Sequence, residues 1–176
     1  HRLANLVQQI ESRLAAVRTS TDWEAILAQH RRAMLAAMHD LGGAINDFAF
    51  ALMKAIRVDS YGRLLNNRAV SGPDLGRQTK LDTIARYHFC CAFENAVAPD
   101  YVTEKIFDPL LAGTIPIYRG APNVGEFVPE GSYIDAADFP TPAALAAHLR
   151  HLLKDEDSYA GYFDWRSRPL PPRLAA

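Results

Sequence analysis

The sequence has no charge excess, no long hydrophobic run and no signal-peptide pattern. Its 19 Lys and Arg against 20 Asp and Glu give the 176-residue chain a formal net charge of −1, without the basic surplus of a general nucleic-acid-binding protein. No apolar run approaches the ~20 residues of a membrane-spanning helix. The first residues mix His, Arg, Asn and Gln with leucine, unlike a signal peptide. With 49% apolar and 22% charged residues, the composition is that of one globular domain, with room for a helical extension.

The chain also has little cysteine and no phosphate-binding glycine loop. Cys90 and Cys91 are adjacent, and vicinal cysteines rarely bridge each other, so no disulfide framework is expected and a reducing compartment is the default. Both lie in an apolar run, which favours core residues over nucleophiles. His148 and His151 lack further ligands at zinc-site spacing, so no metal is expected. The absence of a G-x-x-x-x-G-K-[ST] pattern argues against a P-loop nucleotidase.

Proline is missing from the first 72 residues, although the chain contains 11. This part is rich in alanine, and its apolar residues between positions 3 and 17 recur with the spacing of one helical face, which predicts a first helix. A capping box at Thr21–Glu24 predicts a second helix, from about Asp22 to His39. A third helix is predicted near Asp47–Ile56, with buried Phe48, Leu52 and Ile56.

The change in composition predicts a domain boundary. We assign residues 1–56 to an α-helical N-terminal extension, residues 57–168 to an α/β domain and residues 169–176 to a tail. The apolar stripe over 3–17 cannot stay exposed as a lone helix in water. We therefore expect it to pack on the neighbouring helices or to mediate self-association.

The second part of the chain alternates compact apolar runs with helical patterns. Strands are predicted over 58–62, 88–93, 114–118 and 132–134, and helices over 80–86, 103–111 and 141–153. Pro116 argues that its strand lies at an edge or is irregular, because proline cannot donate to a strand ladder. The alternation with short connections predicts an α/β fold with a Rossmann-like parallel sheet.

Polar residues gather between the predicted strand 88–93 and the next helix, where open α/β sheets bind ligands. Thr103 can cap that helix, and the helix dipole together with Lys105 would attract an anion such as a diphosphate. Glu104 only accepts hydrogen bonds when ionised, which suits sugar hydroxyls or a developing cation. With Asn95 and Tyr101 on the rim, the segment predicts a nucleotide-sugar site. The alternative is an ordinary helix start, in which Glu104 complements the dipole and Lys105 is solvated.

A longer motif runs through the same segment. It reads Phe93-Glu94-Asn95, five residues, then Tyr101-Val102-Thr103-Glu104-Lys105-Ile106, and it resembles the signature of the α1,3/4-fucosyltransferases, glycosyltransferase family 10. Other pieces agree in order over residues 57–168. They are Val58–Arg63 with Asn66-Asn67, Tyr87-His88-Phe89, Ala112–Tyr118 with Gly120-Ala121-Pro122, Phe127-Val128-Pro129, Ser132-Tyr133-Ile134, Asp138-Phe139 and Tyr162–Arg166.

The resemblance implies a GT-B glycosyltransferase, built from two Rossmann-like domains, whose C-terminal domain binds GDP-fucose. Fucose would pass, with inversion and without a metal or cofactor, to a GlcNAc or glucose hydroxyl of a glycan acceptor in α1,3/4 linkage. By position, Asn95, Tyr101, Glu104 and Lys105 fall on donor-site residues. Lys105 would neutralise the diphosphate, and Glu104 would act catalytically beside the charge that develops on fucose. Glu94 would either contact the nucleotide or support the loop.

Three departures from the family pattern stand out. The family's N-terminal acceptor domain supplies the general base, and residues 1–56 are too short and too helical for it. The position of the family's phosphate-binding arginine falls on Ile45 by ungapped counting, with Arg31 and Arg32 upstream. Cys90 stands where some members have a tyrosine near the nucleotide.

These departures leave two rival functions open besides fucosyl transfer. One is a catalytically inactive nucleotide-sugar-binding remnant, and the other is a GT-B transferase with another donor. The alanine-rich composition favours a bacterial cytoplasmic enzyme, and a Golgi ectodomain is the alternative.

Overall fold

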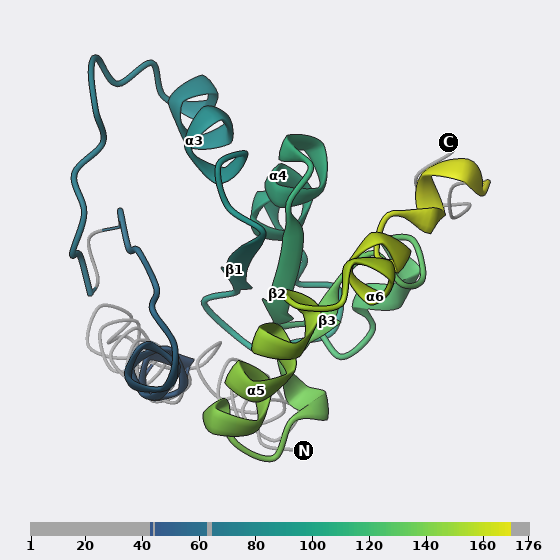
Figure 1. Cartoon of the computed structure of the whole chain (residues 1–176). Coiled ribbons are helices and arrows are strands. Elements are labelled where there is room, and N and C mark those ends of the chain that lie inside the picture. Colours follow the sequence, from purple (N-terminus) through teal and green to yellow (C-terminus); the bar gives the residue numbers. More distant parts are fainter. Residues whose placement is uncertain (1–42, 44, 63–64, 170–176) are drawn as a thin grey trace, which may run out of the picture. The chain divides into compact units, whose positions relative to one another are not determined.

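Three strands form a parallel sheet of order β1-β2-β3 in the computed structural model, which describes residue 43 and residues 45–62 and 65–169. They are β1 (Phe89–Phe93), β2 (Ile115–Arg119) and β3 (Ile134–Asp135), and Figure 1 shows them side by side. β1 pairs with β2 from Phe89↔Ile115 to Phe93↔Arg119, whereas β3 pairs with β2 at two positions only. The predicted α/β fold with a parallel sheet is confirmed.

The helices begin at short polar caps. Thr103, Thr141 and Asp155 each accept a backbone N–H of the helix that follows, which satisfies one of the donors left free in a first turn. The labelled helices are α3 (Arg77–Ile84), α4 (Glu104–Ala112), α5 (Pro142–Leu152) and α6 (Glu156–Gly161), with 3₁₀ turns at Val124–Glu126, Ala136–Asp138 and Asp164–Ser167. A further helix covers 45–55. None of the described helices is long and apolar enough to cross a membrane.

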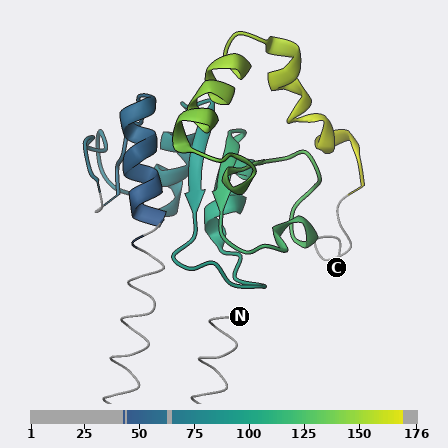
Figure 2. The same cartoon turned by 90° about the horizontal axis from the view of Figure 1, so that it is seen from below.

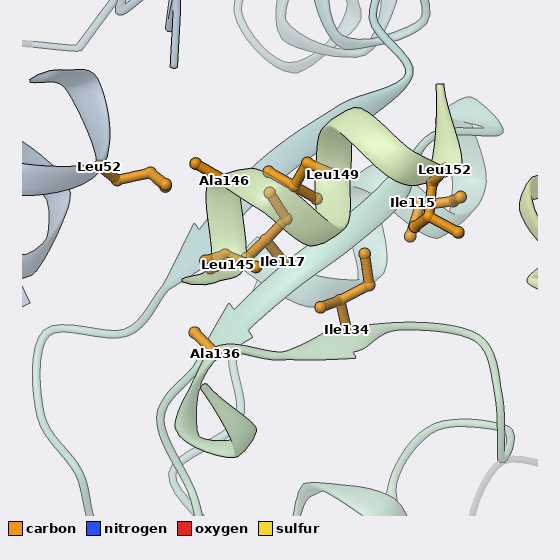
Figure 3. Close-up of a cluster of buried hydrophobic side chains, with 9 residues drawn as sticks. All are labelled: Leu52, Ile115, Ile117, Ile134, Ala136, Leu145, Ala146, Leu149 and Leu152. Atoms are coloured by element: carbon orange, nitrogen blue, oxygen red, sulfur yellow. The ribbon is translucent and has the colours of Figure 1, made fainter. Parts of the chain in front are cut away.

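The two faces of the sheet bury different side chains. Because side chains alternate along a strand, Ile115 and Ile117 of β2 point to one face, where α5 packs, while Tyr118 points to the other, against Ile106 of α4. Figure 3 shows the first cluster, in which the leucines of α5 lie over the β2 isoleucines. Helix on sheet on helix is the layering that a parallel sheet needs to bury both faces.

The helix over 45–55 packs with the sheet. Leu52 is 1% exposed in the core cluster between the sheet and α5, as predicted, whereas Phe48 and Ile56, also predicted to be buried, pack against this cluster and are only partly buried. The described residues, from 43 to 169, belong to one compact unit, and Figure 2 shows the helix in blue beside the strands. The three assigned segments, with a boundary at residue 56, stay a prediction. The predicted helices over 3–17 and 22–39, and the self-association assigned to them, lie outside the described residues.

Two strand predictions need correction. Residues 58–62 form no strand but an extended loop, which Asn67 holds through its side chain at Val58 O and Ser60 N. Pro116 lies in the central strand of the three, not at an edge. Its missing N–H is tolerated because β3 pairs with β2 only at Ile117 and Tyr118.

Two smaller expectations also differ. Cys91 is exposed, because no described strand covers the outer side of β1, whereas Cys90 is half-buried. Burial raises the pKa of the Cys90 thiol to about 11, so it is protonated and unreactive at neutral pH. The helix predicted over 80–86 begins earlier, at Arg77. Its start is fixed by two hydrogen bonds, from Leu75 N–H to the Thr79 hydroxyl and from Gly76 N–H to the Asp74 carboxylate.

A buried carboxylate ties α3 to α4. Asp108 of α4 is 0% exposed. It accepts two hydrogen bonds from Arg77 of α3, at 2.7 and 3.0 Å, and lies 2.7 Å from Lys80 Nζ. Burial by itself would raise the pKa of Asp108, but the bonds from Lys80 and Arg77 outweigh it and hold the pKa below its ordinary value.

We expect Asp108→Asn to lower the free energy of unfolding at pH 7 by about 1–2 kcal/mol. The loss is moderate because the side chains of Arg77 and Lys80 are 62% and 43% exposed and can turn to water. Because the pKa of Asp108 is lower in the folded chain than in the unfolded chain, its negative charge stabilises the fold at pH values above the pKa of the unfolded chain. This stabilisation is lost as the pH falls through the pKa of the folded chain. Urea melts should therefore converge for wild type and variant at low pH, with the exposed Asp82→Asn as control. A constant difference at all pH values would contradict this.

Candidate functional site

The predicted site lies at the carboxyl ends of β1 and β2. Glu94 follows β1 directly, and its backbone N–H donates to Arg119 O at 2.8 Å, which continues the β1–β2 ladder. A loop then leads to Thr103, the N-cap of α4. β1, this loop and α4 thus place the polar residues where parallel sheets bind ligands.

Glu94 is the buried centre of this site. Its side chain is 0% exposed. One oxygen accepts Thr103 N–H at 2.8 Å, and both accept the Thr103 hydroxyl, at 3.0 and 2.8 Å. Lys105 Nζ donates to the second oxygen at 3.2 Å. A buried carboxylate needs such partners, because an unpaired one is costly. Of the two roles left open for Glu94, this geometry supports the loop-supporting one.

Lys105 is therefore a positioned cation. Its side chain is 28% exposed, with the ammonium held by Glu94 and lying 3.5 Å from Thr103 Oγ1. Its backbone N–H donates to the same hydroxyl at 3.4 Å. The ammonium thus stands at the N-terminus of α4, where the dipole also favours an anion. Of the three N–H donors of the ammonium, Glu94 and Thr103 take two, and the third remains for such a ligand.

The other predicted residues lie on the surface around Lys105. Glu104, Asn95 and Tyr101 are exposed, the tyrosine by 37%. The carboxylate of Glu104 lies 3.9 Å from Lys80 Nζ of α3. The structure thus joins Lys105 with Glu94, pairs Glu104 with Lys80, and leaves Asn95 and Tyr101 exposed at the rim.

A second loop holds the first one in place. Asp100 and Asn123 exchange two hydrogen bonds of 3.0 Å, between Asp100 N–H and the Asn123 side chain and between both side chains. Asp100 has φ 62°, a left-handed conformation that aspartate tolerates better than most residues. Gly120 begins the second loop, and a Cβ there would lie 2.6 Å from Glu94 Cγ. The two loops therefore fit closely around Glu94.

Sequence reasoning missed Arg119. It ends β2 at the ligand-binding edge, and a signal was present, because a charged residue directly follows the apolar run 114–118. Ile45, at the position of the family's arginine, is 6% exposed in the core and offers no polar group. Arg31 and Arg32 lie outside the described residues.

A separate acidic cavity lies beyond β3. It measures about 500 Å³ and is lined by Gly125, Glu130, Gly131, Tyr133, Asp135 and Asp138. Burial raises the pKa of Asp135 above its ordinary value. None of the predicted site residues lines this cavity, and its carboxylates would repel a diphosphate. A site for an anion is therefore expected at the carboxyl ends of β1 and β2, and not in this cavity.

Comparison with known proteins gives consistent results. The family model "Glycosyltransferase family 10 (fucosyltransferase) C-term" matches residues 34–173. The "GDP-fucose protein O-fucosyltransferase 3" of Bos taurus is 38% identical over 122 residues, 65% of this chain and 25% of that protein. The Xenopus tropicalis protein of the same name is 41% identical over 121 residues, 65% of this chain and 26% of that one.

Solved structures agree with the sequence relatives. A crystal structure of alpha1,3-fucosyltransferase with GDP superposes with a TM-score of 0.60 at 27% identity, over 69% of this chain and 34% of that one. The same enzyme name with GDP-fucose gives 0.58 at 27% identity, over 69% and 35%. This chain thus spans about a quarter to a third of the proteins it matches.

Proposed function

Because the chain belongs to glycosyltransferase family 10, whose C-terminal model it matches over residues 34–173, we propose that it forms the GDP-fucose-binding part of a fucosyltransferase. The observation that carries the proposal is the Lys105 ammonium, fixed by Glu94 at the N-terminus of α4 beside the carboxyl end of β1. A helix N-terminus with a positioned lysine suits a diphosphate.

The remaining site residues take roles around the sugar. We assign Asn95 and Tyr101 to the rim, where they hold the nucleotide sugar through side-chain hydrogen bonds. Glu104, exposed next to Lys105, faces the fucose and stabilises the positive charge that develops as the bond to the diphosphate breaks. The two-domain GT-B architecture is part of this proposal, with the acceptor-binding domain and the general base outside the described residues.

Two classes of acceptor are proposed for the fucose. An α1,3 linkage is supported by the 27%-identical structures named alpha1,3-fucosyltransferase, and a GlcNAc or glucose hydroxyl as its acceptor is what the resemblance of the motifs implies. A protein hydroxyl is supported by the relatives named protein O-fucosyltransferase, at 38–41% identity. Product analysis after incubation with GDP-fucose and each acceptor class distinguishes them.

We expect Lys105→Ala to weaken GDP binding roughly ten- to a hundredfold, because a charge-assisted contact of about 1.5–3 kcal/mol is lost. Calorimetric titration of GDP measures this. The melting temperature should fall as well, because the buried Glu94 carboxylate loses its cation, so the titration is run well below the melting transition. Lys154→Ala, which removes an exposed lysine just after α5, is the matched control. Unchanged GDP affinity in the Lys105 variant would refute the assignment of the diphosphate to α4.

A donor-binding remnant without turnover is the second candidate. It is favoured by the buried Ile45 at the position of the family's arginine. The same sample decides between the two: GDP binding with transfer of fucose supports the enzyme, and GDP binding without transfer to either acceptor class supports the remnant.

A further inference from the structure

Arg119 occupies the ligand-binding edge of the sheet opposite Lys105. It ends β2, in register with Phe93 at the end of β1, and its carbonyl accepts the N–H of Glu94. The Glu94 side chain in turn holds the Lys105 ammonium. Arg119 and Lys105 are therefore both direct neighbours of Glu94, one through the backbone and one through the side chain.

The two cations approach this edge from opposite faces of the sheet. Arg119 alternates with Tyr118, whose side chain packs on the α4 side, so it lies on the side of Ile117 and of the helix over 45–55. There its guanidinium lies over the Phe48 ring, 4.6 Å from the centroid. Phe48 also packs edge-on against Phe93. The aromatic ring thus fixes the plane of the guanidinium at the end of β1 and β2.

Arg119 has hydrogen-bonding capacity that the described part of the chain does not use. Its Nε–H is buried, yet no described residue accepts it, and no carboxylate of the described residues forms an ion pair with Arg119. The charge of Arg119 acts on Asp135 only at longer range, where it partly offsets the effect of burial. Lys105, by contrast, is already paired with Glu94. A buried arginine donor without an acceptor costs free energy, which an anionic ligand would recover.

We propose that Arg119 is the second phosphate-binding cation of this site, and that it and Lys105 hold the diphosphate of a nucleoside diphosphate from opposite sides of the sheet. The inference rests on the proposed donor function. An arginine adds what a lysine lacks, since its planar fork can donate two parallel hydrogen bonds to one phosphate. Arg119 would thus supply the positive charge that Ile45, at the position of the family's phosphate-binding arginine, does not.

The experiment titrates GDP and guanosine calorimetrically into wild type, Arg119→Gln, Arg119→Lys and Arg166→Gln. The control Arg166 is also stacked on a phenylalanine, with 4.7 Å to the Phe163 ring, but lies near Gly113 at the other end of α4. We expect Arg119→Gln to weaken GDP roughly ten- to a hundredfold, with guanosine affinity changed less than about twofold. Arg166→Gln should bind both ligands as wild type does.

Arg119→Lys separates charge from geometry and decides the case if the glutamine variant does not fold. It keeps an alkyl chain over Phe48 and a positive charge, so its GDP affinity should fall only partly, with guanosine unaffected. If both Arg119 variants fold and bind GDP as tightly as wild type, or if GDP and guanosine affinity fall by the same factor, the phosphate-binding role of Arg119 is overturned. The proposed donor function would still stand. A wild-type chain that does not bind GDP would overturn the proposed function itself.

Discussion

We expect Glu94→Gln to lower the free energy of unfolding by about 2–4 kcal/mol, because the buried partner of an ion pair and several accepted hydrogen bonds are changed together. The glutamine oxygen can still accept Thr103 N–H, but its amide then places a donor where Lys105 Nζ now lies 3.2 Å away. Two donors would then face each other beside a side chain at position 94 that is buried from water. For a chain of this length the loss corresponds to a fall in Tm on the order of 4–15 °C.

Thermal and urea melts at neutral pH measure this effect. Glu130→Gln is the matched control, since Glu130 is exposed and its charge can be lost with a change of less than about 0.5 kcal/mol. A double variant, Glu94→Gln with Lys105→Met, should recover part of the loss, because the stranded ammonium is removed as well. Equal stability of wild type and Glu94→Gln would show that the contacts around Glu94 do not stabilise the α4 start.

We expect Gly120→Ala to cost about 3 kcal/mol in stability and to weaken GDP binding with it. A Cβ at this position would lie 2.6 Å from Glu94 Cγ and 2.7 Å from Tyr118 Cζ. Neither side chain can give way easily. Tyr118 is 1% exposed and its hydroxyl accepts Ala121 N–H at 2.9 Å, while Glu94 is held by Thr103 and Lys105.

The same loop offers a control for this substitution. A Cβ at Gly125 would meet nothing nearer than Tyr133 Oη at 3.9 Å, so Gly125→Ala should melt within about 1 °C of wild type. Neither glycine has a positive φ, so the difference between the two variants measures the space around Glu94 and not backbone strain. If Gly120→Ala and Gly125→Ala had the same melting temperature, the conclusion that the two loops fit closely around Glu94 would be wrong.

Both variants act on the same group of atoms, and this connects stability to binding. Glu94 fixes the start of α4, holds Lys105 and sets the distance to the loop after β2. A change at Glu94 or Gly120 should therefore alter the position of the Lys105 ammonium as well as the melting temperature. Lys105→Ala removes the cation but leaves the hydrogen bonds between Glu94 and Thr103 in place, so the three variants change different parts of the site.

The sequence by itself predicted the elements whose signals are local. The apolar run before Glu94 became β1, and Thr103 caps α4 as its spacing to the helix indicated. The leucines of the last predicted helix face the core of the sheet from α5. These features depend on neighbouring residues, on helix capping and on alternation, which are properties of a short stretch of chain. The family signature from Phe93 to Ile106 is local in the same sense, because its residues follow one another along 14 positions of the sequence.

The tertiary structure decided which charges pair with which. Glu94 and Lys105 are 11 residues apart, and Arg77 and Asp108 are 31 apart, so no local pattern joins them. The same holds for Arg119 over Phe48 and for the loop at 58–62, where Asn67 replaces a strand partner. Pro116 could take a central strand only because β3 is short. Spacing along the chain specifies periodicity, but burial and ion pairing depend on which elements the fold brings together, and that is settled by packing across the whole sheet.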